Sequence, residues 1–121
     1  MTWTIVFANR PDFDAFMKKL TKDQRRLVAA GLFVRLATLG PDVCKTSSGK
    51  ALGGNLYELR IKKDPSALIR VFFALHRNRV VVILGGYNKK ADPSERRQAQ
   101  EIRDARDAFD DWRARNTSEK R

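Results

Sequence analysis

The sequence LYELRIKKDPSALIRVFFALHRNRVVVILGGYNKK occupies residues 56–90 and decides the fold of this chain. In residues 56–62 apolar and charged side chains alternate, a pattern typical of a strand with one buried face. Residues 68–76 are rich in β-branched and aromatic side chains, which favour strands. Residues 80–84 read VVVIL and are apolar on both faces, as in the central strand of a sheet. Polar turns separate the three runs, so the stretch predicts three successive strands.

The same part of the chain carries most of the positive charge. Between Cys44 and Lys90 there are ten lysines and arginines against two acids, Glu58 and Asp64; ten minus two gives +8 of the formal net charge of +11. Because strands hold these charges on a rigid surface, we expect that surface to face a partner. A polyanion is the partner that such a surface favours.

Length and composition indicate one folded domain over residues 1–121. A hydrophobic content of 42%, with seven phenylalanines and two tryptophans, excludes a disordered chain. A charged content of 32% excludes a membrane protein. In addition, no apolar run reaches the roughly 18 residues of a spanning helix. The start of the chain is predicted to be a strand and not a signal peptide. Cys44 is the only cysteine, so we expect a cytoplasmic protein with no internal disulfide and no thiolate metal cluster. One histidine and two acids in the central stretch could hardly build a site for a divalent ion, and no cofactor is expected.

The N-terminal third predicts a strand followed by two helices. Residues 3–7 have the β-branched and aromatic content of a strand, and Pro11 is placed to open a helix. Thr21, followed three residues later by Gln24, is the signature of a capping box at the start of a second helix. That helix is expected to end at Gly40. The two helices therefore form a predicted hairpin.

Two further segments flank the predicted strands. Residues 45–55 contain three glycines and two serines, which predicts a mobile loop carrying Lys45 and Lys50. Residues 92–95 read DPSE and predict a helix capped by the aspartate, and the charged tail at 113–121 is expected to fray. The fold class is therefore α+β. An N-terminal strand and a helical hairpin pack on a small, mostly antiparallel sheet, and a C-terminal helix follows.

Three motifs, in this order and at this spacing, carry a family resemblance: GNLYELR at residues 54–60, IRVFF at residues 69–73, and VVVILGGYNKK at residues 80–90. With the order of predicted elements, they make the chain resemble the RelE/ParE superfamily of bacterial toxins, most closely its HigB-type and phage-derived branch. The resemblance extends to about Trp112. It implies a RelE-like fold.

The resemblance also implies an activity and partners. Toxins of this kind cleave mRNA in the ribosomal A site, inhibit translation and are held inactive by an antitoxin encoded beside them. The HigB-type branch implies a helix-turn-helix antitoxin and a toxin–antitoxin hetero-oligomer. Other branches poison DNA gyrase, so the alternative is a non-catalytic toxin or binding module that targets gyrase or nucleic acid.

By this resemblance, the substrate's 2′-hydroxyl attacks the neighbouring phosphate without a metal. The reaction needs a base, cations for the developing negative charge and an acid for the leaving 5′-oxygen. Arg60 and Arg70 fall where relatives place catalytic cations, and a guanidinium suits a phosphate that is gaining charge. Of the two, Arg70 is the first candidate. Lys89 and Lys90 match the basic pair that closes the family's last strand, where one member contacts the scissile phosphate or protonates the leaving group.

Glu58 departs from the family pattern, because ribosome-dependent relatives of the RelE type carry lysine at this position. One interpretation makes Glu58 a general base whose pKa is lowered by Arg60 and Arg70. The other makes it an ion-pair partner that holds Arg60 in place. A second departure is the missing tyrosine early in the last helix, where some relatives use one.

The candidates for contacts with RNA are Lys45, Lys50, Lys62, Tyr87 and His76. The lysines are suited to phosphates, although exposed lysines also serve solubility. Tyr87 follows two glycines at a strand end, where its ring can stack on a base. His76 lies on the same face of its predicted strand as Arg70 but about 20 Å further along. Both an RNA contact and a plain surface histidine therefore stay open.

Overall fold

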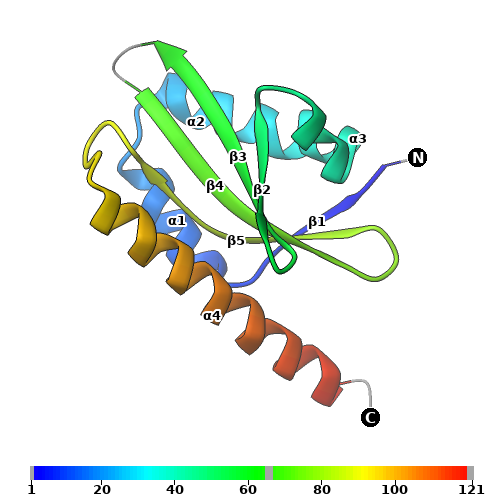
Figure 1. The fold of residues 1–121 in the computed structure, drawn as a ribbon. Coiled ribbons are helices and arrows are strands. Elements are labelled where there is room, and N and C mark those ends of the chain that lie inside the picture. The colour runs from blue at the N-terminus through cyan, green and yellow to red at the C-terminus, as the bar shows by residue number, and fades with distance from the viewer. Residues whose placement is uncertain (1, 65–66, 120–121) are drawn as a thin grey trace.

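The computed structural model describes residues 2–64 and 67–119 and has three layers (Figure 1). In chain order the elements are β1 (Thr4–Phe7), α1 (Arg10–Lys18), α2 (Lys22–Ala30), the π-helical stretch η1 (Gly31–Leu36), α3 (Ala37–Leu39), the 3₁₀ helix η2 (Gly40–Lys45), β2 (Gly49–Gly53), β3 (Leu56–Asp64), β4 (Ala67–His76), β5 (Val80–Asn88) and α4 (Glu95–Glu119). The first helices lie on one face of the sheet and α4 crosses the other (Figure 1).

The sheet has the strand order β1-β5-β4-β3-β2. β1 runs parallel to β5, and the other neighbouring pairs are antiparallel. This arrangement confirms the predicted α+β fold with a mostly antiparallel sheet, an N-terminal strand and a C-terminal helix. β5 lies between two strands, which explains why its first half is apolar on both faces.

Alternation along the strands divides the core into two clusters, one on each face of the sheet. Leu59 and Ile61 of β3 face the first helices, whereas Glu58 and Arg60 face the side of α4. The helix-side cluster consists of Phe13, Leu20, Val28, Leu32, Leu36, Val43, Leu59, Ile61, Ile69, Val71, Phe73, Val81 and Ile83. The cluster beneath α4 consists of Ala8, Leu56, Phe72, Ala74, Val82, Leu84, Tyr87, Ala105 and Phe109.

Most of the predicted helix boundaries are confirmed. Thr21 and Gln24 form both hydrogen bonds of the capping box, with backbone N–H groups donating to Oγ1 and Oε1. The cap of α4 is a correction: Ser94 Oγ, and not Asp92, accepts the N–H of Arg97 at 3.1 Å. Asp92 instead accepts the N–H of Ser94 and holds the turn that precedes the helix.

Two segments expected to be irregular are regular. Residues 49–53 are not a mobile loop but strand β2, which pairs antiparallel with β3. The tail expected to fray from residue 113 continues α4 to residue 119, and residues 120–121 lie outside the described part of the chain. Arg115 donates a hydrogen bond of 2.9 Å to the carbonyl of Ala8, which ties the end of α4 to the sheet.

A β-bulge in β5 changes which side chains face α4. Phe72 and Phe73 are neighbours in β4, but their partners Gly85 and Ile83 are two residues apart. In an unbroken strand Tyr87 would share a face with Ile83. After the bulge it faces α4 instead.

One helical stretch, Lys22–Lys45, is long and apolar enough to cross a membrane by length and composition alone. Core helices of globular proteins pass the same test. Here four of its side chains, Val28, Leu32, Leu36 and Val43, are fully buried against the sheet, so the core accounts for much of its apolar character.

Candidate functional site

Arg60, Arg70 and Tyr87 form a row across three adjacent strands. Arg60 of β3 lies opposite Arg70 of β4, and Arg70 lies opposite Tyr87 of β5. Directly opposed residues share a face of the sheet and have Cβ atoms about 5 Å apart. Two like charges in this position repel each other, so the pair requires a nearby anion.

Glu58 supplies that anion. Its Oε2 lies 3.2 Å from Arg60 Nε, which donates a hydrogen bond, and its Oε1 lies 3.5 Å from Arg70 Nε. Glu58 is completely buried, and Arg70 retains only 8% of its exposure. A buried carboxylate between two guanidinium groups compensates one positive charge and leaves the cluster with a net charge of about +1.

Exposure separates the roles of the two arginines. The side chain of Arg60 is 36% exposed and that of Arg70 is 9% exposed. The guanidinium of Arg60 is therefore open to an incoming phosphate, whereas Arg70, the first candidate from the sequence, is a mostly buried positive charge on the neighbouring strand.

Tyr87 completes the row in a buried position. Its hydroxyl, Glu58 Oε1 and Arg70 Nε are buried polar atoms for which the described residues supply no hydrogen bond of good geometry. Burial, and then the negative charge of Glu58, raise the pKa of Tyr87 above its ordinary value of 10.0. The phenol is therefore protonated at neutral pH, and its ring stacks near Phe72 with centroids 6.1 Å apart.

Arg97, at the start of α4, lies beside the row and is not among the candidates from the sequence. Its guanidinium lies 5.4 Å from the centre of the Tyr87 ring and donates to Glu101 Oε2 at 2.8 Å. It also lies 3.8 Å from Asp92. The spacing of Arg97 and Glu101, four residues apart on a helix, is the signal in the sequence that could have indicated this pair.

The structure places Lys50 and Lys62 near the row and Lys45 away from it. Lys50 lies on β2 directly opposite Glu58, so the two share a face of the sheet, and Lys50 is exposed. Lys62 is exposed two residues beyond Arg60 on β3. Lys45 lies on η2, where it forms an exposed ion pair of 3.4 Å with Asp42.

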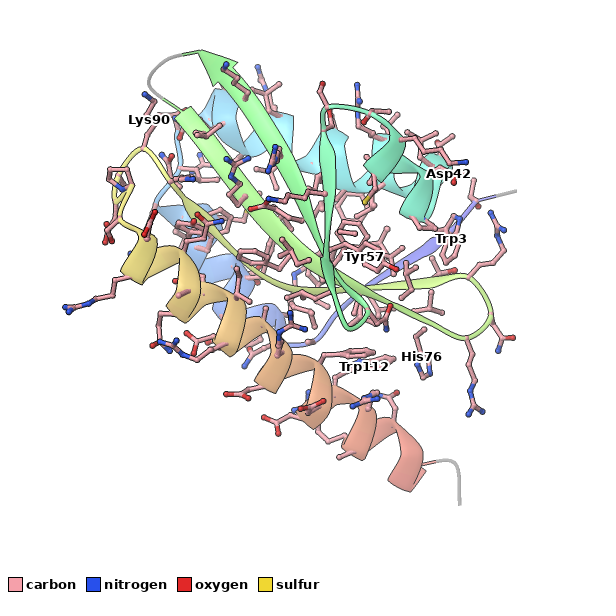
Figure 2. All side chains as sticks on the ribbon, viewed as in Figure 1. Trp3, Asp42, Tyr57, His76, Lys90 and Trp112 are labelled. Atoms are coloured by element: carbon pink, nitrogen blue, oxygen red, sulfur yellow. The ribbon has the colours of Figure 1, made fainter. Side chains whose placement is uncertain are left out.

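Lys89 and Lys90 follow the last residue of β5 at the Arg70 end of the sheet. The N–H of Lys89 donates to the carbonyl of Leu68 at 2.8 Å, and that of Lys90 donates to Asn88 Oδ1 at 3.1 Å. Lys89 is half-buried and Lys90 is exposed. Figure 2 shows Lys90 in the turn between β5 and α4.

His76 lies at the opposite end of β4 from this turn. Figure 2 shows it beside Trp112 of α4, and the two rings meet edge to face with centroids 4.8 Å apart. It is half-buried there and is not part of the arginine row. Tyr57 lies on the helix side of the sheet, as alternation predicts, and stacks on Phe73 with centroids 5.3 Å apart.

The described residues give little support to three other kinds of site: a metal site, a thiol nucleophile and a second groove that binds RNA. They contain no group of three or more histidines, cysteines, aspartates or glutamates that could hold a metal ion. Burial raises the pKa of the Cys44 thiol, which disfavours the nucleophilic thiolate. A groove of about 380 Å³ between α1 and α4 is lined by Asp12, Asp104, Asp107 and Asp111, and its negative charge does not suit RNA.

Two comparisons with known proteins found matches. The family described as phage-derived protein, Gp49-like, matches residues 15–110. No curated protein sequence matches the chain. Among solved structures, a chain of the toxin–antitoxin complex RelBE2 from Mycobacterium tuberculosis is similar in fold, with a TM-score of 0.55 and 16% sequence identity. That similarity covers 74% of this chain and 94% of the other.

Proposed function

This chain belongs to the phage-derived Gp49-like family and has a RelE-type fold, and from that premise we propose that it is the toxin of a type II toxin–antitoxin system. We propose further that it is an endoribonuclease that cleaves mRNA on the ribosome and so inhibits translation. The observation that carries this proposal is the pairing of Arg60 with Arg70 across β3 and β4.

The arrangement suits cleavage of a phosphodiester by the RNA's own 2′-oxygen. The 2′-hydroxyl gives its proton to solvent water as its oxygen bonds to phosphorus, and the bond to the 5′-oxygen breaks. The 5′-oxygen takes up a proton, which leaves a 2′,3′-cyclic phosphate and a 5′-hydroxyl. Negative charge accumulates on the phosphate in between, and Arg60 is the exposed guanidinium that can donate to it. Arg70 strengthens the positive potential from the neighbouring strand, in a position where water screens it little.

Glu58 acts in this proposal as a positioning residue. It has no exposed surface, so it cannot contact a 2′-hydroxyl outside the sheet, and both of its oxygens already face arginines. Of the two interpretations of Glu58, its burial supports the ion-pair partner over the general base.

Lys89 or Lys90 then protonates the leaving 5′-oxygen. Both follow β5 two or three residues after Tyr87, which pairs with Arg70, so the lysines lie at the same end of the sheet. Lys50 and Lys62 contact flanking phosphates, and Arg97 lies over the Tyr87 ring at the side of the site next to α4. Tyr87 is buried, so its ring does not stack on a base as expected from the sequence.

The proposal includes partners. The similar chain from Mycobacterium tuberculosis comes from a toxin–antitoxin complex. We propose likewise a cognate antitoxin, with a helix-turn-helix domain, that forms a hetero-oligomer with this chain in the cytoplasm. The ribosome and its mRNA are the proposed targets.

Induced expression in bacteria tests this function. We expect growth arrest and new 5′ ends within translated mRNA by primer extension, and we expect both to be lost with Arg60→Ala. Intact mRNA in arrested cells would exclude the endoribonuclease. DNA supercoiling damage in those cells would identify gyrase as the target instead.

A further inference from the structure

An apolar stripe on α2 and η1 is exposed beside β3. Leu27 is 37% exposed and Val34 is 65% exposed, which is unusual for large hydrophobic side chains in the described part of the chain. They lie seven residues apart, or two helical turns, so they share one face of the helix. Ala30 and Gly31 fill the space between them along that face. Exposed apolar residues that gather on one face mark a binding surface more often than isolated ones do.

A groove of about 370 Å³ lies between this stripe and β3. Leu27, Gly31 and Val34 line its helix side, and Leu59 and Ile61 line its strand side. The groove therefore offers a continuous apolar surface, of the kind that accepts side chains from another protein.

The outer edge of β3 is open along the same groove. β2 pairs with β3 only as far as Leu59, where Gly49 is its partner, and the N–H of Arg60 then donates to Ser48 at 2.7 Å. β3 continues to Asp64, and among the described residues no strand pairs with this last part on that side. An open edge next to an apolar groove is suited to an added strand or an extended segment of a partner.

The rim of the groove is positively charged. Arg35, Arg60 and Lys62 line it, and no acidic side chain does. Arg35 donates to Ser48 Oγ at 3.1 Å, which holds its guanidinium at the rim. An occupant that fits must carry both apolar side chains and carboxylates.

We infer that this groove binds an acidic segment of the antitoxin, whose apolar side chains contact Leu27 and Val34 and whose backbone lies along the open edge of β3. The inference rests on the proposed function, because it needs an antitoxin. RNA does not explain the apolar stripe, and a second copy of a chain with net charge +11 would be repelled by the basic rim. The bound segment lies next to Arg60, which also lines the groove, so the antitoxin narrows the access of substrate to this arginine.

The test uses the purified toxin and the purified protein encoded by the adjacent reading frame. Val34→Asp places a carboxylate in the apolar groove, and we expect it to weaken binding by at least about tenfold. Thr4→Asp is the matched control, since the side chain of Thr4 is about as large as that of Val34. Thr4 is exposed on β1 at the far edge of the sheet. We expect its affinity to stay within about twofold of the wild type. Both variants should still arrest growth when expressed alone.

A second pair tests the rim by charge. Arg35→Glu should weaken binding most at low salt, whereas Arg26→Glu, which changes an exposed arginine outside the groove, should have little effect. The melting temperature of each variant checks that it folds. Unchanged affinity in both Val34→Asp and Arg35→Glu would overturn the groove while the antitoxin proposal stands. No binding by the wild-type toxin would overturn the partner and the groove together, whereas mRNA cleavage by the wild type would still support the toxin.

Discussion

At the scale of single residues, the site is organised by one buried carboxylate between two arginines. Glu58 has no exposure, and Arg70 has almost none. Charges buried to this degree are stable only while their partners are present. The same residue that looks like a catalytic base in the sequence is therefore first of all a structural requirement of the arginine row.

Glu58→Ala should lower the free energy of unfolding by about 3 kcal/mol, because Arg70 would remain buried without an anion. Denaturant unfolding measures this loss. Asp23→Ala removes a carboxylate from an exposed ion pair and should change stability by less than about 1 kcal/mol. Equal effects of the two substitutions would contradict the role given to burial.

Tyr87 provides a test through pH. Since burial raises its pKa in the folded protein, the native state keeps the phenol proton at a pH where the unfolded chain has lost it. Its contribution to stability is complete below the ordinary pKa of 10.0 and is lost as pH rises towards the folded-state pKa. Tyr87→Phe should therefore lose less stability than the wild type above about pH 10. Parallel stability curves for the two proteins would refute this.

Alternation in the sequence predicts part of this site but not all of it. It places Glu58 and Arg60 on one face of β3, and the register brings Arg70 opposite Arg60. Tyr87 reaches the same face only because a bulge shifts its strand, and bulges depend on pairing between strands. Arg97 joins through a helix packed from the far end of the chain, which local patterns do not reveal.

At the scale of elements, the segments predicted best are those with local signals. The capping box at Thr21 and the apolar run of β5 need no distant partner to be recognised. β2 is the opposite case. Its sequence, GKALG, has low strand propensity, and it becomes a strand only because β3 offers it an edge.

Gly40, which caps α3 and begins η2, illustrates a constraint that is both local and distant. Its φ is +54°, and a Cβ there would lie 2.4 Å from the indole of Trp3. Gly53 has φ +90°, but a Cβ there would have nothing within 4 Å, so Gly53→Ala isolates the backbone strain. We expect Gly40→Ala to be less stable than Gly53→Ala by about 2 kcal/mol in thermal unfolding, because it adds the clash. Equal losses would show that Trp3 gives way freely.

At the scale of the whole molecule, charge of opposite sign lies on different surfaces. The basic side chains of β2 and β3 lie on one side, and the groove between α1 and α4 is lined by aspartates. The net charge of +11 therefore understates how strongly the basic surface attracts a polyanion.

The salt dependence of RNA binding tests this separation. If Lys50 contacts one phosphate of single-stranded RNA, Lys50→Ala should reduce the slope of log Kd against log salt by about 0.7. Lys22→Ala, an exposed lysine at the start of α2, is the control and should leave the slope unchanged. The same change in slope for both variants would indicate binding through overall charge alone.

The most direct test of the central claim is the single-turnover rate of mRNA cleavage on purified ribosomes by the wild type and by Arg60→Ala. Removing the exposed guanidinium should lower the rate by about 100-fold and weaken RNA binding far less, because Arg60 acts on charge that develops during the reaction. An Arg60→Ala variant that cleaves at the wild-type rate, or a wild type that leaves the mRNA intact, would contradict the account.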